Sequence, residues 1–169
     1  NKALRFIDTP YFMRLDADDS LSEDALEKIS LELFLRNKKD FIVFNRFDIC
    51  EKSVQKLKTA NNIYTWISGG TVFNTEAVRS VGGYSKEYWE EYDLYIKLLE
   101  KGAKFKISPY HIYYYRRGHD SMTFNYKKNN EGYKSLLKKW GLATLDKYGD
   151  IRRFRKYYRI NEEIECPRQ

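Results

Sequence analysis

The chain has 169 residues, which suits a single domain with a substantial core, and its 42% hydrophobic and 33% charged residues make a globular composition. The formal net charge is +7, but basic and acidic residues are interspersed, which does not favour a dedicated nucleic-acid-binding protein. No apolar run approaches the roughly 20 residues of a membrane span. Cys50 and Cys166 lack the spacing of a zinc site or disulfide framework and favour a reducing compartment.

The order of apolar runs and helical patterns predicts an α/β protein. In chain order, the first half is expected to hold the end of a helix at residues 1–7, a buried strand at 11–15, a helix at about 22–36, a strand at 41–49 and a surface loop at 51–62. Leu26, Ile29 and Leu33 share one face of the predicted helix and are expected to be buried. Because the chain opens on a helix end, we expect further residues upstream of Asn1.

The second half continues the alternation. It is expected to hold an extended segment at 63–73, a short helix at 75–81, a helix at about 88–101, strands at 104–108 and 111–116, and helical pieces from 125 onward. Asn74 is a suitable N-cap for the short helix, and Gly82 and Gly83 end it. Together these elements predict a mixed sheet flanked by helices.

Three carboxylates, Asp16, Asp18 and Asp19, follow the first strand directly. Open α/β sheets bind their ligands at the carboxyl ends of strands, and acids this close repel one another unless a cation joins them. One interpretation is therefore a divalent cation with oxygen ligands, of the kind that carries a nucleotide diphosphate. The alternative is a solvated helix start in which Ser20 and Glu23 form a capping box.

An EF-hand calcium loop is a second way to use these acids. Asp16, Asp18, Ser20 and Glu27 stand at loop positions one, three, five and twelve. Position six requires glycine for its sharp turn, and this chain has Leu21 there. A strand rather than a helix also precedes the acids, so this interpretation is disfavoured.

A phosphatase of the haloacid dehalogenase type is a third interpretation, with Asp16 as nucleophile and Asp18 as proton donor. Its motif continues to Thr or Val where this chain has Ser20. It also needs a later Gly-Asp pair for magnesium, and the pair at 149–150 lies between basic helices. This interpretation is disfavoured as well.

Four segments, taken in order, resemble the motifs of family 2 glycosyltransferases with a GT-A fold. They are residues 1–19 with Asp16-Ala17-Asp18-Asp19, residues 67–73 with 77–84, the acidic helix start Glu90-Glu91-Tyr92-Asp93-Leu94, and Tyr114-Tyr115-Arg116-Arg117-Gly118-His119 followed by Ser121 and Thr123. The resemblance implies a partial GT-A domain at 1–124 that lacks its N-terminal nucleotide-binding strands. Residues 125–169 would then form a basic, aromatic-rich helical extension.

The resemblance also implies a donor site that uses a divalent cation, Mn²⁺ or Mg²⁺. Asp18 would be the first metal ligand, with Asp16 near the ribose or a metal-bound water and His119 as a third ligand or phosphate contact. Asp19 would orient the pair or cap the helix. The remaining candidates for binding the donor are the cations Arg116 and Arg117, of which at most one can face the site from a strand, and the glycines Gly69 and Gly70, which allow close backbone approach or mark a bulge.

The acceptor side is assigned to the acidic helix start. Glu91, with Glu90 beside it, takes the place of the catalytic base, where the family usually has Asp. Asp93 is expected to cap the helix or pair with a lysine four residues on. Trp89 and Tyr88 would stack on the acceptor sugar or belong to the core.

The function implied is sugar transfer from a nucleotide-diphosphate donor to a hydroxyl of a saccharide or lipid-linked saccharide, by a single inverting displacement. Such a hexosyltransferase would serve polysaccharide biosynthesis for the cell envelope, in the cytoplasm or at the cytoplasmic membrane face. The alternative is a non-catalytic sugar- or partner-binding module of the same fold, since Glu91 departs from the pattern. The basic, aromatic tail at 151–160 is interpreted as a solvated helix face or a peripheral membrane contact, and no nucleic-acid partner is expected.

Overall fold

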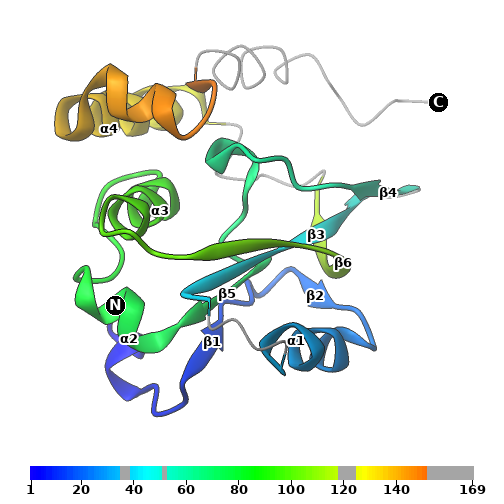
Figure 1. Ribbon diagram of the computed structural model, residues 1–169. Coiled ribbons are helices and arrows are strands. Elements are labelled where there is room, and N and C mark those ends of the chain that lie inside the picture. The colour runs from blue at the N-terminus through cyan, green and yellow to red at the C-terminus, as the bar shows by residue number, and fades with distance from the viewer. Residues whose placement is uncertain (35–38, 51–52, 118–124, 152–169) are drawn as a thin grey trace.

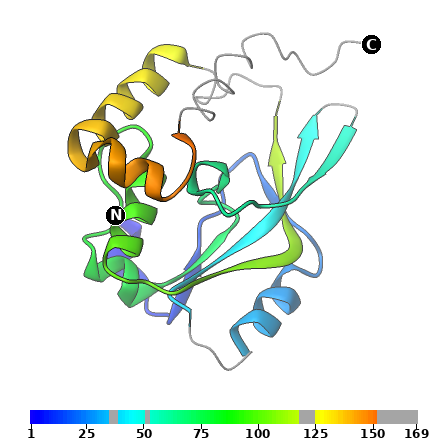
Figure 2. The ribbon, with the colours of Figure 1, turned by 45° about the horizontal axis from the view of Figure 1, so that its top comes forward.

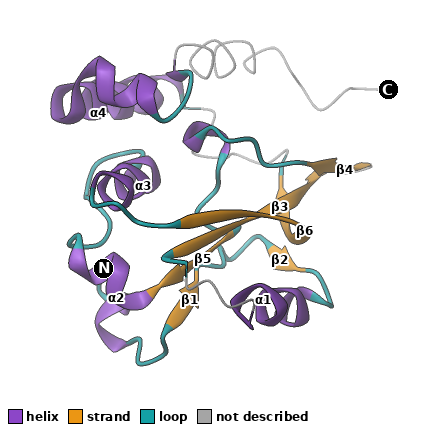
Figure 3. Cartoon of the chain, in the orientation of Figure 1, coloured by secondary structure: helices purple, strands orange, loops and turns teal. Residues whose placement is uncertain are grey.

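The computed structural model describes residues 1–34, 39–50, 53–117 and 125–151. Within these ranges the predicted α/β class is confirmed, because one mixed sheet lies between helices on its two faces (Figures 1 and 3). The elements in chain order are the 3₁₀-helix η1 (Ala3–Phe6), β1 (Tyr11–Met13), β2 (Ser20–Leu21), α1 (Ala25–Phe34), β3 (Phe41–Cys50), β4 (Ser53–Leu57), the 3₁₀-helix η2 (Ile63–Thr65), β5 (Thr71–Asn74), α2 (Thr75–Ser80), α3 (Glu90–Glu100), β6 (Phe105–Arg116) and α4 (Tyr126–Lys147).

The sheet is organised around β3. Its strand order is β1-β5-β3-β6-β2, with β4 paired to β3 as a hairpin, and β3 and β6 run parallel. β3 begins with consecutive apolar residues, and side chains alternate between the faces of a strand. Phe41 and Val43 therefore enter the core beneath α3, whereas Ile42 and Phe44 enter the core beneath α1. The uninterrupted apolar run is the reason that this strand is buried on both faces.

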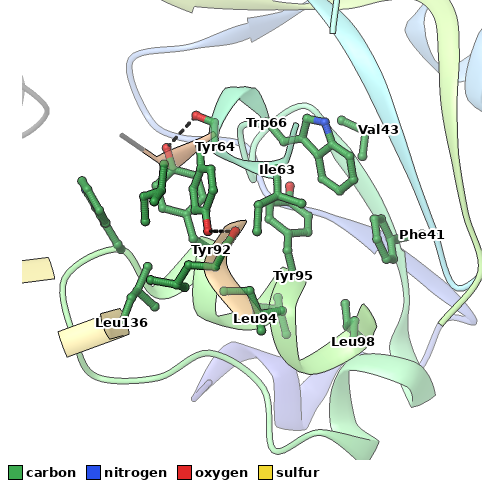
Figure 4. Close-up of a cluster of buried hydrophobic side chains, with 14 of the residues drawn as sticks. Phe41, Val43, Ile63, Tyr64, Trp66, Tyr92, Leu94, Tyr95, Leu98 and Leu136 are labelled. Atoms are coloured by element: carbon green, nitrogen blue, oxygen red, sulfur yellow. Dashed lines mark hydrogen bonds between the residues drawn. The ribbon is translucent and has the colours of Figure 1, made fainter. Parts of the chain in front are cut away.

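The larger core is rich in aromatic rings and is built around Tyr95 of α3 (Figure 4). The Tyr95 ring lies edge-on to Trp66, with centroids 5.1 Å apart, and 5.7 Å from Phe41. Its hydroxyl is hydrogen-bonded to the Thr71 hydroxyl at 2.7 Å, so the buried polar atom is satisfied. These contacts fix α3 on the sheet.

Two segments differ from the sequence predictions. Residues 53–57, predicted as loop, form β4, whose side chains are exposed except at its last residue. A strand at the margin of a sheet needs no apolar face, so the polar composition of β4 gave no strand signal in the sequence. The segment predicted to be extended at 63–73 begins with η2, where the Asn62 side chain accepts a hydrogen bond from the Tyr64 amide.

The burial of α1 also differs from its prediction. Ile29 and Leu33 pack against the sheet as expected, but Leu26 is 73% exposed. The buried positions are instead Ala25 and Glu32. A buried acid is tolerated there because the Glu32 carboxylate accepts hydrogen bonds from the Lys106 ammonium at 2.5 Å and from the Ser108 hydroxyl at 2.9 Å.

Other boundaries shift as well. The first strand ends at Met13 rather than Leu15, and the two strands predicted around Pro109 form the single strand β6. The Asn45 amide donates a hydrogen bond to the Pro109 carbonyl at 2.9 Å, where the β3–β6 register shifts. The predicted cap is confirmed, since the Asn74 side chain accepts a hydrogen bond from the Ala77 amide.

Helix α4 packs on α3 (Figures 1 and 2), and a buried carboxylate joins the two helices. Asp93 is 2% exposed and pairs with Lys97 at 2.9 Å, as predicted, and with Lys139 of α4 at 2.7 Å. The Trp140 indole also donates to it at 2.8 Å. Burial alone would raise the pKa of Asp93, but these donors outweigh it and hold the pKa below its usual value. No described helix, α4 included, is both long and apolar enough to cross a membrane.

Replacing Asp93 by Ala is expected to lower the free energy of unfolding by about 3 kcal/mol, because two lysines lose their buried partner. Urea unfolding measures the loss, and amide exchange in α4 should accelerate. Glu76→Ala is the matched control, since Glu76 is 78% exposed in its pair with Arg79 and surface pairs contribute little. Equal effects of the two substitutions would contradict the role given to Asp93.

Candidate active site

The end of β1 and the start of α3 meet at a single guanidinium group. Arg14 follows β1, and its Nε lies 3.1 Å from a carboxylate oxygen of Asp16. Its Nη1 lies 3.1 Å from the carboxylate of Glu90, on the first turn of α3. Arg14 therefore joins two of the predicted acidic segments, and its partner Glu90 is 76 residues away from it in the sequence. One signal for this residue was available in the sequence: a cation inside an apolar strand run that ends in acids.

The carboxylate of Asp19 forms hydrogen bonds within the fold. It accepts hydrogen bonds from the Tyr113 hydroxyl at 2.6 Å and from the Arg116 amide at 2.8 Å. Burial, set against these two hydrogen bonds, leaves the pKa of Asp19 above its usual value, and Asp18 and Asp16 raise it further. These bonds attach the turn to β6, so Asp19 neither caps α1 nor has a carboxylate without partners.

Asp16 and Asp18 lie on a tight turn closed by a hydrogen bond from the Asp19 amide to the Asp16 carbonyl at 3.1 Å. The Asp18 residue is exposed, and the Asp16 side chain is 42% exposed. Within the described residues, no group of three or more His, Cys, Asp or Glu side chains is arranged to hold a metal ion. A Mn²⁺ or Mg²⁺ held by these two carboxylates would therefore have to take its other ligands from water or from a diphosphate. His119 lies outside the described residues.

Glu91 is partly buried beside these charges. Burial raises the pKa of Glu91 to about 7, with the negative charge of Glu90 adding to the effect and Arg14 opposing it. Tyr88 is partly buried too, and burial together with Glu91 and Glu90 raises the pKa of its hydroxyl to about 12. The start of α3 thus holds a carboxyl group that titrates near neutrality next to a tyrosine.

Trp89 has a different environment from the one expected for an acceptor contact. Its side chain is 6% exposed, and its indole N–H donates to Asn129 of α4 at 3.1 Å. The structure places Trp89 in the core, which was the second of the two predicted options, and Tyr88 is the more accessible ring. Trp89 also has φ +70°, a left-handed conformation that costs a bulky residue about 1–3 kcal/mol.

The two glycines of the middle motif have internal roles. A Cβ at Gly69 would overlap the Tyr113 hydroxyl, so only glycine allows that ring to reach the acidic turn. Gly70 is buried, and its carbonyl accepts a hydrogen bond from the Phe44 amide at 2.9 Å. Close approach of this backbone to a donor therefore stays a prediction.

Of the two predicted arginines, one is directed elsewhere. Arg117 forms an ion pair with Asp48 of β3, whose carboxylate also pairs with Arg46 at 2.8 Å. Arg116 is exposed, and its backbone amide is bound to Asp19. Arg116 is thus the one of the two whose side chain is exposed, and its contact with a diphosphate stays a prediction.

Sequence reasoning did not anticipate the aromatic ring beside Arg14. The Tyr84 hydroxyl is hydrogen-bonded to the Ser68 hydroxyl at 3.0 Å, and the Arg14 guanidinium carbon lies 6.0 Å from the centre of the Tyr84 ring. Tyr84 and Ser68 belong to the glycine-containing middle motif. Together with the acidic turn and the acidic start of α3, this motif is the third segment that meets around Arg14. Only their order was visible in the sequence.

Comparison with known proteins places the chain in a family. The family model described as glycosyl transferase family 2 matches residues 1–159. The crystal structure of S. aureus TarS 1–349 in complex with UDP is similar with a TM-score of 0.54 and 12% identity, over 81% of this chain and 44% of that chain. The chain thus spans less than half of the TarS chain. No curated protein matches the sequence.

The structural likeness supports the predicted GT-A-like fold, with its mixed sheet between helices. At 12% identity it shows the fold alone. The family match extends over nearly the whole chain and includes the acidic turn, Arg14 and the start of α3. This chain belongs to glycosyltransferase family 2.

Proposed function

We propose that the protein containing this chain transfers a sugar from a nucleotide-diphosphate donor to a hydroxyl of a saccharide or lipid-linked saccharide. The observation that carries the proposal is the junction at Arg14, which holds Asp16 and Glu90 each at 3.1 Å. The junction brings the turn proposed to bind the donor beside the helix that carries the proposed base. Membership of the family and the UDP bound in the TarS crystal structure support the same class of donor.

Asp16 and Asp18 would hold the divalent cation, with His119 as a third ligand, and the bound cation would neutralise charge on the departing diphosphate. Arg14 adds a positive charge that belongs to the protein, and its pairing with Asp16 keeps that carboxylate oriented. Arg116 is the candidate for a phosphate contact, because guanidinium groups match phosphate oxygens.

Glu91 is proposed to be the general base. A base is most effective when its pKa lies near the working pH, and the pKa of Glu91 is about 7. The acceptor oxygen forms a bond to the anomeric carbon while the bond from that carbon to the diphosphate oxygen breaks. The hydroxyl proton passes to the Glu91 carboxylate. Attack from the face opposite the diphosphate inverts the anomeric configuration.

Asp18→Asn is expected to weaken binding of UDP in the presence of Mn²⁺ by at least tenfold, because one of two carboxylate ligands is lost. Calorimetry on the whole protein, with and without Mn²⁺, measures the change. Asp24→Asn is the matched control. Asp24 is a carboxylate only six residues further along the chain, but it pairs with Lys28 and Ser22 instead of belonging to the proposed donor site. Unchanged affinity in Asp18→Asn would remove Asp18 from the donor site.

Glu91→Gln is expected to slow sugar transfer by about 10²–10⁴-fold, the usual contribution of a general base. Donor binding should stay within about twofold, because the base acts only on the acceptor. Glu87→Gln is the control, as Glu87 is an exposed acid four residues earlier. Retained turnover in Glu91→Gln would exclude the base role. Donor binding without turnover in the unsubstituted protein would favour the non-catalytic alternative.

Glu91 should also make stability depend on pH. Between its ordinary pKa of 4.5 and the folded value of about 7, the folded protein holds a proton that the unfolded chain has lost. The free energy of unfolding therefore falls as pH rises through this range. Glu91→Gln removes this effect and should be more stable than the unsubstituted protein at pH 8, by about 1 kcal/mol after solvent screening. Urea unfolding at pH 8 and pH 4 tests it, and an equal difference at both pH values would contradict it.

A further inference from the structure

We infer that α4 positions the proposed base through Trp89, with Asn129 and Gly132 as positioning residues. The inference rests on the proposed function, since it concerns where Glu91 is held. The starting observation is that a bulky residue occupies the left-handed region, φ +70°, immediately before Glu90 and Glu91. Such a conformation persists only where the surroundings impose it.

The backbone of Trp89 starts α3. Its carbonyl accepts hydrogen bonds from the Tyr92 amide at 3.1 Å and the Asp93 amide at 3.2 Å, and its side chain provides no cap. The orientation of this one peptide therefore sets the direction of the first helical turn. Glu90 and Glu91 lie on that turn, and Glu90 reaches Arg14 from it. A change in the Trp89 backbone would move both acids.

The surroundings that impose the conformation belong to α4. The buried indole N–H of Trp89 donates to the Asn129 side chain at 3.1 Å. One helical turn later, a Cβ on Gly132 would lie 2.9 Å from Cγ of Trp89 and 3.0 Å from the Tyr88 carbonyl oxygen. The α4 backbone thus lies directly against residues 88–89, and only glycine permits this approach.

A second contact holds the same turn of α3 from the same helix. Asp93 binds Lys139 and the Trp140 indole of α4, at 2.7 and 2.8 Å. Helix α4 therefore contacts the first turn of α3 at Trp89 and at Asp93. Arg14 forms an ion pair with Glu90 of the same turn. Misplacement of a reacting group by about 1 Å can cost roughly 10²-fold in rate. These contacts are therefore expected to affect the rate of transfer as well as stability.

The test is Asn129→Ala in the whole protein, which removes the side-chain acceptor of the indole N–H. Turnover at saturating donor and acceptor, per folded molecule, should fall by about 10-fold or more. The UDP affinity should fall by much less than the turnover, because Arg14 still pairs with Asp16 when Glu90 shifts. Asn129→Asp keeps an acceptor oxygen and should restore most of the turnover.

Asn125→Ala is the matched control on the same helix. Asn125 caps α4 by accepting a hydrogen bond from the Lys128 amide at 3.0 Å and is exposed. It should reduce stability without changing turnover per folded molecule. If Asn129→Ala does not fold, Gly132→Ala serves in its place, since the added methyl group displaces Trp89 and should produce the same selective loss.

Equal turnover per folded molecule in Asn125→Ala and in the Asn129→Ala or Gly132→Ala variant would overturn the inference, as would failure of Asn129→Asp to restore activity. Glu91→Gln is measured in parallel. If that variant remains active, the proposed base is wrong. If it is inactive while the α4 variants behave like the control, only the inference about α4 fails.

Discussion

Repulsion among carboxylates is the constraint on which this structure depends. Asp16, Glu90 and Glu91 come together from distant parts of the chain, and Arg14 supplies the positive charge between them. Unit charges a few ångströms apart at a protein surface interact by several kcal/mol, so the gathering requires such a counter-charge. Arg14 compensates Asp16 and Glu90 directly and leaves Glu91 the group with the raised pKa. The raised pKa of Glu91 itself comes from burial and from the charge of Glu90, against the opposing charge of Arg14.

Much of the fold followed from local patterns. The run Phe41–Phe44 predicted the central strand because four consecutive apolar residues can be satisfied only by burial on both faces. β4 escaped prediction because a strand at a sheet margin needs no apolar side chains. Leu26 was misplaced because the inward face of α1 runs through Ala25 and Glu32, and the sequence does not show that Lys106 and Ser108 allow an acid to be buried there.

The order of the site motifs along the chain was predicted, but the side-chain contacts between them were not. Sequence motifs located the acids, yet the partners that orient them come from other elements, as Tyr113 does for Asp19. Tyr113 is one aromatic residue among several on β6, and nothing local distinguishes it. Trp89 could be assigned to acceptor or core only once α4 was seen against it. Long-range contacts of this kind leave no periodic signal in the chain.

The contact between Trp89 and α4 has a consequence for how such chains can recombine. Buried contacts from Asn129 and Gly132 cross the boundary predicted between residues 124 and 125. Leu136 and Leu145 cross it as well, as members of the same core as α3. A chimera that joined residues 1–124 to the helices of another protein would inherit a left-handed tryptophan without the neighbours that impose it. The unit of exchange is therefore α3 together with α4, and the two helices are expected to vary as a pair.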